Sequence, residues 1–393
     1  MKIKSIYILS LVASFSAFFI SCRMDPVGIQ NLANFSDTTA IIKSSTTIPF
    51  GFALDSALFL NNAKYKAVAI AEANSATLLN QLSHAKIVKA DGSLDFTNSD
   101  ALVIPVASAG LNLYGYSLIG NHDLNAAYLK TYSGITAGLP TSTIQLKLDT
   151  AMNKFITQTI THYKDKIHSW AVVSEPLADN GSVGLNSGRS TTSSDVVVWS
   201  AYMGKDFALK ALNYAHAADP TASLYMEESY LDVYAIKVDS LISYVNYLKG
   251  KGAQVDGIGV QLFINISNGT GLNTYANIEI AFRKLGATGL KIRISALSVN
   301  ENPLAKPFFD PTDVYKLNYQ AETYKYIIDS YVKNIPAAQR TGITIWGIDD
   351  AHANLLIRAD KNTPITSISP LLFNGNFAKK PAFSAVFLST NGK

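Results

Sequence analysis

The sequence predicts a single α/β domain built as a (β/α)₈ TIM barrel, in which eight parallel strands close into a cylinder inside a ring of helices. Strand-like apolar runs alternate with amphipathic stretches from residue 48 to the C-terminus, and eight such alternations follow one another. These runs are continuously apolar rather than alternating, which is typical of parallel strands buried on both faces. The length of 393 residues suits one barrel with a short N-terminal extension.

Eight segments carry the strand pattern. In chain order they are Ile48–Leu54, Ala67–Ala71, Leu113–Ile119, Ser169–Ser174, Ser223–Glu227, Gly257–Phe263, Lys291–Ala296 and Gly342–Trp346. Barrels of this class place their active sites at the C-terminal ends of the strands, so the residues that end these runs are the first candidates for function.

Helical patterns lie between the strands. Thr143–Tyr163 is the clearest, because its apolar residues recur along one face. Similar patterns cover Val198–Asp219, Ala235–Lys249, Tyr275–Leu285 and Asp313–Asn334. Pro220 and Gly250 stand where two of these helices are expected to end.

The N-terminus reads as a targeting segment. Residues 1–21 combine an early pair of lysines with an apolar run that is too short for a confident transmembrane helix. Cys22, the only cysteine, follows directly, which predicts a bacterial lipoprotein acylated at Cys22 and held at the outer membrane or cell surface. An ordinary signal peptide with an incidental cysteine is the alternative. A flexible linker is expected over residues 22–47 and the barrel over 48–393.

Composition excludes several classes of function. The net charge is only +4, and no basic run marks a nucleic-acid-binding protein. The six histidines are scattered, and no phosphate loop, dinucleotide fingerprint or nucleophile elbow occurs. We therefore expect no metal, no cofactor and no nucleic-acid partner.

Several strand ends carry motifs of one family. His168–Pro176, Asp256–Gln261 and Ile345–Asp350 resemble the fourth-, sixth- and eighth-strand motifs of the family 10 glycoside hydrolases, the endo-β-1,4-xylanases. Pro370–Asn374 and Lys380–Phe383 are similar to the closing segment of that family. The resemblance covers roughly residues 48–387 and keeps the family's motif order. It implies a barrel fold and a xylan-like β-linked polysaccharide as the partner.

The resemblance also implies that the family's chemistry is altered here. A retaining glycosidase needs two carboxyl groups about 5–5.5 Å apart, one as acid/base and one as nucleophile. Glu175 occupies the acid/base position in the fourth-strand motif. The nucleophile position in strand seven falls on Ala296, within Ile294–Ser298, and alanine carries no carboxylate. The protein is therefore expected to be a pseudoenzyme.

The residues that grip the sugar in the family are also largely replaced. Gln261 and Trp346 are retained, whereas Ser174 stands for an asparagine and Phe263 for a histidine. The strand-three motif loses both histidines, which become Tyr116 and Asn121, and the family's lysine after strand two is assigned to Ser75. Two roles stay open for each of these residues. Glu175 is as compatible with contacting a ligand as with a purely structural role, and Trp346 is compatible with packing or with stacking against a sugar ring.

Two nearby glutamates are the best substitutes for the missing carboxylate. Glu227 and Glu228 end strand five, although a solvated or ion-paired pair is the simpler interpretation. Three functions stay open: a non-catalytic glycan-binding lipoprotein, an active glycosidase that uses Glu175 with a non-standard nucleophile or a water-attack mechanism, and a protein-interaction scaffold. The altered motifs favour the first.

Overall fold

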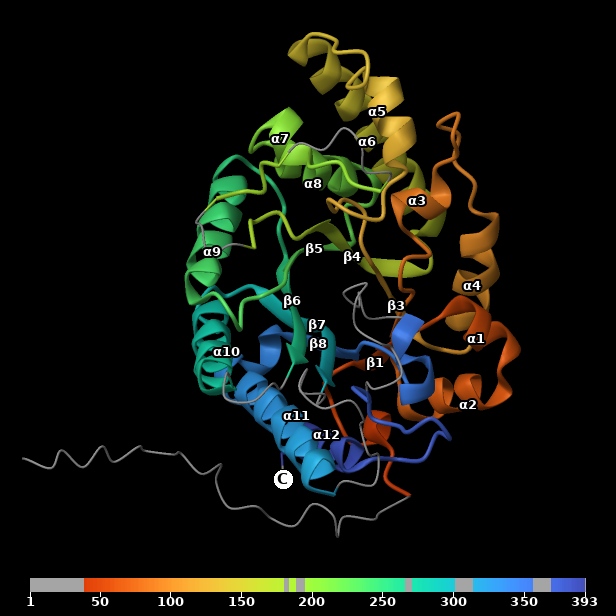
Figure 1. Ribbon diagram of the computed structural model, residues 1–393, viewed down its shortest axis with the longest axis vertical. Coiled ribbons are helices and arrows are strands. Elements are labelled where there is room, and N and C mark those ends of the chain that lie inside the picture. Colours follow the sequence, from red (N-terminus) through yellow and green to blue (C-terminus); the bar gives the residue numbers. More distant parts are fainter. Residues whose placement is uncertain are drawn as a thin grey trace, which may run out of the picture. The chain divides into compact units, whose positions relative to one another are not determined.

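The computed structural model describes residues 39–179, 184–188, 195–265, 271–300, 314–355 and 369–392. Within these residues eight parallel strands form a closed barrel in the order β1 to β8, with helices around it (Figure 1). Phe52 of β1 pairs with Ile345 of β8, and this pairing closes the cylinder. The (β/α)₈ barrel predicted from the sequence is confirmed.

The strands differ in length around the barrel. They are β1 (Phe50–Ala53), β2 (Ser75–Thr77), β3 (Asn112–Gly115), β4 (Ile167–Ser174), β5 (Ser223–Glu228), β6 (Gly257–Asn265), β7 (Lys291–Asn300) and β8 (Arg340–Ile345). The longer strands β4, β6 and β7 extend further than the short strands β2 and β3 at the C-terminal end of the barrel. Here "barrel top" denotes the end of the barrel where the strands finish.

Helices follow the strands and cover the outside of the barrel (Figure 1). They are α1 (Ser56–Asn61), α2 (Ala63–Glu72), α3 (His84–Ile87), α4 (Thr97–Ser108), α5 (Ala126–Ser133), α6 (Thr141–Tyr163), α7 (Trp199–Met203), α8 (Phe207–Ala218), α9 (Ala235–Gly250), α10 (Gly271–Gly286), α11 (Val314–Asn334) and α12 (Pro381–Thr390). Short 3₁₀ helices occupy Ile42–Ser44, Ala337–Gln339 and Asp350–Leu355. No helix among the described residues is long and apolar enough to cross a membrane.

Two predicted elements were wrong. The strand expected at Ala67–Ala71 lies inside α2, an alanine-rich helix whose first turn is capped by the Asn62 side chain, which accepts from the Tyr65 backbone at 3.0 Å. The true second strand, Ser75–Thr77, is short and made of small residues, so it lacks an apolar run. The single helix expected over Val198–Asp219 is divided at Gly204, whose φ of 71° ends α7.

The predicted linker boundary at residue 47 also falls too late. Ile42 is fully buried, and its backbone N–H donates to Glu72 at 3.2 Å. Glu72 in turn pairs with Lys379 at 3.0 Å, near the C-terminus. Residues 39–47 therefore pack onto the barrel, while residues 22–38 of the expected linker lie outside the described residues.

Glycines inside the barrel make room for large polar side chains. A Cβ at Gly257 would lie 2.2 Å from the Tyr225 ring, and one at Gly259 would lie 2.7 Å from the Glu227 carboxyl. Tyr225 and Glu227 therefore occupy interior space that branched aliphatic residues fill in most barrels. The interior below the barrel top is unusually polar as a result.

Candidate functional site

Glu175 stands at the barrel top, directly after β4, in a strained backbone conformation. Its φ of 52° lies in the left-handed region, which costs a non-glycine residue about 1–3 kcal/mol. Its backbone N–H donates to the Glu227 carbonyl at 2.9 Å, and its own carbonyl accepts from the amides of Asn121 and Asn186, each at 3.2 Å. These bonds hold the residue in place and leave its side chain half-buried at the rim.

Gln261 connects the ends of three strands. Its amide nitrogen lies 3.1 Å from Ser174 Oγ and 3.1 Å from a Glu227 carboxyl oxygen, and Tyr116 Oη is 3.4 Å away. Gln261 is 1% exposed, so this cluster forms the floor of the site rather than its surface. The structure brings together Ser174, Gln261 and Tyr116, which were named from the sequence, and places Asn121 beside them on the Glu175 carbonyl.

Ala296 lies in an apolar cluster. It is fully buried and packs with Ala53 and Trp346, while Leu79 and Tyr116 cover the cluster from the side. Trp346 is only 7% exposed, so packing accounts for most of its surface. The position that the resemblance assigns to the nucleophile is thus a buried methyl group packed against apolar side chains.

Two aromatic rings contact Trp346, which packs against Ala296. The Tyr116 and Phe263 rings each meet the Trp346 ring edge to face, with centroids 5.2 and 5.8 Å away. Phe263 is 38% exposed and presents its ring to solvent. Phe263, rather than the buried Trp346, is therefore the aromatic surface that a ligand at this side meets first.

The alignment after strand two needs correction. The family's lysine was assigned to Ser75 because the second strand was expected at Ala67–Ala71, whereas Ser75 itself begins the second strand, Ser75–Thr77. A residue that follows the second strand must therefore come after Thr77, so the assignment to Ser75 was wrong. Leu79, two residues after this strand, packs against the Ala296 cluster, so this strand end also contributes an apolar side chain.

Glu227 points into the barrel interior. Tyr114 Oη donates to its carboxyl at 2.6 Å, and Gln261 donates to the other oxygen. Burial raises the pKa of Glu227, although the Tyr114 hydrogen bond and the nearby Arg293 charge oppose this shift. The Arg293 guanidinium lies 3.6 Å from the centre of the Tyr114 ring and donates to Thr344 at 3.0 Å.

Glu228 faces the other way, toward α9. Its carboxyl pairs with Lys237 at 2.8 Å and accepts from the Leu177 backbone at 3.1 Å. Burial raises its pKa to about 8 against the opposing charge of Lys237. The ion-paired interpretation is confirmed for Glu228, but neither glutamate is solvated, since both are fully buried.

Sequence reasoning missed three residues of this region: Tyr114, Arg293 and Lys237. A charged residue inside an otherwise apolar strand run rarely lies buried without a partner, so Arg293 carried a usable signal. Lys237 lies in a helix of ordinary amphipathic pattern, and nothing in the sequence marks its 1% exposure or its pairing with Glu228.

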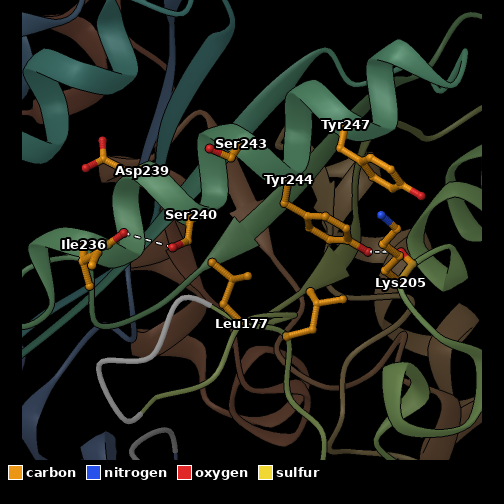
Figure 2. Close-up of a pocket in the computed structure, with 9 residues that line it drawn as sticks. Leu177, Lys205, Ile236, Asp239, Ser240, Ser243, Tyr244 and Tyr247 are labelled. Atoms are coloured by element: carbon orange, nitrogen blue, oxygen red, sulfur yellow. Dashed lines mark hydrogen bonds between the residues drawn. The ribbon is translucent and has the colours of Figure 1, made fainter.

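A separate hollow lies outside the barrel, on α9. It encloses about 470 Å³ and is lined by Leu177, Leu185, Lys205, Ile236, Asp239, Ser240, Ser243, Tyr244 and Tyr247 (Figure 2). We call it the α9 groove. Leu177 comes two residues after Glu175, so the groove begins close to the barrel top.

The described part of the chain contains no group of three or more histidine, cysteine or acidic side chains placed to hold a metal ion. Among the sequence-predicted residues of the barrel top, Glu175 is the acidic group that stands at the rim. Glu227 and Glu228 are engaged below it. In the described residues the site can therefore position polar groups, present an aromatic surface and offer the Glu175 carboxyl at the rim.

Comparison with known proteins agrees with this architecture. The profile of glycosyl hydrolase family 10 matches residues 38–388. The endo-1,4-beta-xylanase A of Cellvibrio japonicus is 28% identical over 93% of this chain and 57% of its own length. An endo-1,4-beta-xylanase of Hypocrea jecorina is 26% identical, covering 93% of this chain and 92% of its own.

Solved structures of this family superpose on the barrel. A thermostable mutant of a xylanase from Cellvibrio japonicus gives a TM-score of 0.74 at 26% identity, covering 89% of this chain and all of its own. The chain spans little more than half the length of the two Cellvibrio japonicus relatives, at 57% and 54%. With the profile matching nearly the whole described barrel, this chain belongs to glycosyl hydrolase family 10.

Proposed function

We propose that this chain is a non-catalytic member of its family that binds a xylan-like β-linked polysaccharide. The observation that carries the proposal is the burial of Ala296 in an apolar cluster. A retaining mechanism needs a carboxylate nucleophile about 5–5.5 Å from the acid/base. At the position where the resemblance expects it, this protein has a methyl group under Trp346, with Leu79 and Tyr116 beside it.

The neighbouring carboxyls support the same proposal. A nucleophile must reach the anomeric carbon of a bound sugar, which requires an accessible oxygen. Both oxygens of Glu227 are engaged, one by Tyr114 and one by Gln261, and the residue has no exposed surface. Glu228 is turned away toward Lys237.

The ligand class follows from the family and from the surface. The relatives are named as xylanases, so a β-1,4-linked xylan is the first ligand to test. The exposed ring of Phe263 suits the apolar face of a sugar, and the half-buried Glu175 side chain supplies a polar group for its hydroxyls. Family 10 ancestry and this mixed apolar and polar rim fit a neutral polysaccharide.

The competing function is an active glycosidase that combines Glu175 with a non-standard nucleophile. The one feature in its favour is the connection from Glu227 through Gln261 to Ser174, the residue before Glu175. The burial of Glu227 weighs against it. Hydrolysis that depends on Glu175 would decide for this function.

The proposal is tested by binding. The purified protein is applied to an array of plant-type polysaccharides, and affinity for soluble xylan is then measured by titration calorimetry. We expect xylan-type glycans to be retained, with competition by xylo-oligosaccharides. A protein that is folded by circular dichroism and retains no β-linked glycan would contradict the proposal.

We also propose that the protein is a lipoprotein of the bacterial cell envelope, anchored through Cys22. The lone cysteine directly after the apolar leader motivates this proposal. A Cys22→Ala variant is expected in the soluble fraction after cell lysis. Retention of that variant in the membrane fraction would show that another segment holds the protein there.

A further inference from the structure

Positive charge gathers at the end of the barrel opposite the barrel top. The eight strands are parallel, so their first residues share one end, which we call the barrel bottom. Lys291 and Arg340 are the first residues of β7 and β8, and Lys164 and Lys166 lie within three residues before β4. Lys43 joins them, because it donates to a backbone carbonyl in the last turn of α2, just before β2. We call these five residues the bottom cations.

None of the bottom cations forms an ion pair with another residue that the structure describes. Lys291 donates to the Ser223 hydroxyl at 2.8 Å and Arg340 to a backbone carbonyl at 2.7 Å, and both acceptors are uncharged. Lysines on the sides of the barrel are paired instead, as Lys284 is with Asp239 at 2.7 Å. The positive charge of the barrel bottom is therefore not neutralised by local pairing.

The two ends of the barrel carry opposite charge. The described loops that directly follow the strands contain seven acidic residues and no lysine or arginine. The segments that lead into the strands, counted with the first residue of each strand, contain the bottom cations and Lys251 against three acids. The seven acids are Asp55, Asp123, Glu175, Asp179, Asp195, Asp232 and Asp349, and the three are Asp165, Asp219 and Asp256. This difference gives the barrel a positive bottom and a negative top.

The N-terminal segment meets the barrel at the same end. Residues 39–47 pack against the last turn of α2 and against Lys379, whose ammonium binds the Ala40 carbonyl. Ile41, beside this contact, is 38% exposed and adds an apolar side chain to the barrel bottom. From residue 39 the chain back to Cys22 can span at most about 60 Å. An acyl group on Cys22 therefore holds the barrel close to a membrane, with the barrel bottom as the attached end.

We propose that the barrel bottom docks on a membrane surface that contains anionic phospholipids, through the bottom cations, so that the barrel top points away from the membrane. The proposal rests on the proposed anchoring through Cys22 and deepens it, because it assigns an orientation. Each lysine or arginine near an anionic surface favours binding by about fivefold, and salt screens the effect. The same surface repels the acids of the barrel top, so the charge difference selects one orientation.

Lysine labelling of the full lipidated chain tests the proposal. The protein is purified from the membrane fraction and reconstituted into vesicles of phosphatidylcholine, alone or mixed with phosphatidylglycerol, and reductive methylation of each lysine is read by mass spectrometry. We expect labelling of Lys164, Lys166 and Lys291 to fall about fivefold on the mixed vesicles only. The labelling should recover in about 1 M salt, where the screening length is about 3 Å.

Lys64 and Lys66 provide a matched control. They are exposed, have the same spacing as Lys164 and Lys166, and flank Tyr65, whose hydroxyl binds the Asp55 backbone directly after β1 at 3.1 Å, near the barrel top. Their labelling should not depend on the lipid.

Charge reversal gives the second readout. Lys164→Glu with Lys166→Glu should remove most of the protection of Lys291, whereas Lys64→Glu with Lys66→Glu should leave it unchanged, and thermal melting confirms that both variants are folded. Equal labelling of the bottom lysines on the two kinds of vesicle, or protection of Lys64 and Lys66 instead, would overturn the docking while the anchoring stands. A purified chain that carries no lipid and floats with neither kind of vesicle would overturn both.

Discussion

The barrel top has two halves of opposite chemistry. At the ends of β4, β5 and β6, polar groups are tightly bonded: the Glu175 backbone N–H donates to the Glu227 carbonyl, Gln261 donates to the Glu227 carboxyl, and Lys237 pairs with Glu228. At the ends of β1, β2, β7 and β8, the corresponding surface is apolar, with Ala296 and Trp346 at its centre. We call these the polar half and the apolar half.

Under the proposed non-catalytic function, the contrast locates the loss on the apolar half. A two-carboxylate mechanism needs both halves to be polar, because the acid/base and the nucleophile come from opposite sides of the sugar-binding cleft. Here the acid/base side carries Glu175 within a hydrogen-bonded set of polar groups, whereas Ala296 on the nucleophile side packs among apolar side chains. One polar half suits binding, whereas catalysis requires both.

The largest expected effect concerns the polar half. Lys237→Met removes the cation beside Glu228, and both residues are almost fully buried. Breaking a buried pair by removing one partner costs about 3–5 kcal/mol, so urea unfolding should show a loss of that size. The double variant Lys237→Met with Glu228→Gln should recover much of it. Lys251→Met is the control, because its pair with Asp206 is about 40% exposed and is expected to cost under about 1 kcal/mol.

The apolar half should resist the return of its carboxylate. Ala296→Glu places an acid among Ala53, Trp346 and Tyr116, where it is expected to lower the free energy of unfolding by about 3 kcal/mol. Ala296→Gln separates the steric cost from the charge. We expect no hydrolysis of aryl xylosides by Ala296→Glu, because a nucleophile must also meet a sugar held in a near-attack pose.

Further substitutions define what else the apolar half lacks. Phe263→His and Ser174→Asn, added to Ala296→Glu, restore two of the family's polar groups beside the new carboxyl. Robust hydrolysis by the single variant would mean that the sugar-gripping residues were never impaired. Hydrolysis that appears only in the triple variant would agree with an apolar half that lacks several polar groups besides the nucleophile.

A buried neutral histidine in α3, packed against α5 and α6, gives a pH-dependent test. His84 is 2% exposed, its Nδ1 accepts from the Asn125 backbone at 3.1 Å, and burial lowers its pKa to about 3. Because the folded pKa lies below the unfolded value of about 6.5, its contribution is present above pH 6.5 and is lost as the pH falls toward 3. The loss should reach about 2 kcal/mol at pH 5. A His84→Gln variant should show a shallower decline in unfolding measurements, and an unchanged slope would assign the decline to other groups.

The smallest effect is expected at the exposed ring of the site. Phe263→Ala removes an aromatic surface that is 38% exposed and contacts Trp346 edge to face. An aromatic contact contributes about 0.5–1.5 kcal/mol beyond its area, so calorimetry should show xylan affinity falling about three- to tenfold. Because Trp346 is buried, Trp346→Ala should affect stability more than affinity. The reverse order would identify Trp346 as the sugar platform.

The sequence was informative where strands are apolar and motifs are dense. Seven of the predicted strands overlap real ones, and the motifs around Glu175, Gln261 and Trp346 placed three strand ends correctly. Strand two failed because Ser75–Thr77 has no apolar run while the preceding helix does, and the alignment of the lysine position failed with it.

Side-chain direction in the polar half was not predictable. Glu227 and Glu228 are adjacent, and strand geometry sends neighbours to opposite faces, but the sequence does not say which one enters the barrel. The answer depends on Gly259, which leaves space for Glu227, and on Lys237, which receives Glu228. Such pairings depend on residues distant in sequence, so local patterns do not reveal them.

The most direct test of the central claim is a hydrolysis measurement on the unmodified protein. Purified protein is incubated with xylan and with an aryl xyloside, and product release is compared with that of Glu175→Gln. We expect no turnover above background in either protein, because general acid catalysis alone typically contributes about 10²–10⁴-fold, against the 10⁶-fold or more that enzymes achieve. Clear turnover by the unmodified protein that disappears in Glu175→Gln would contradict the claim and establish an active glycosidase.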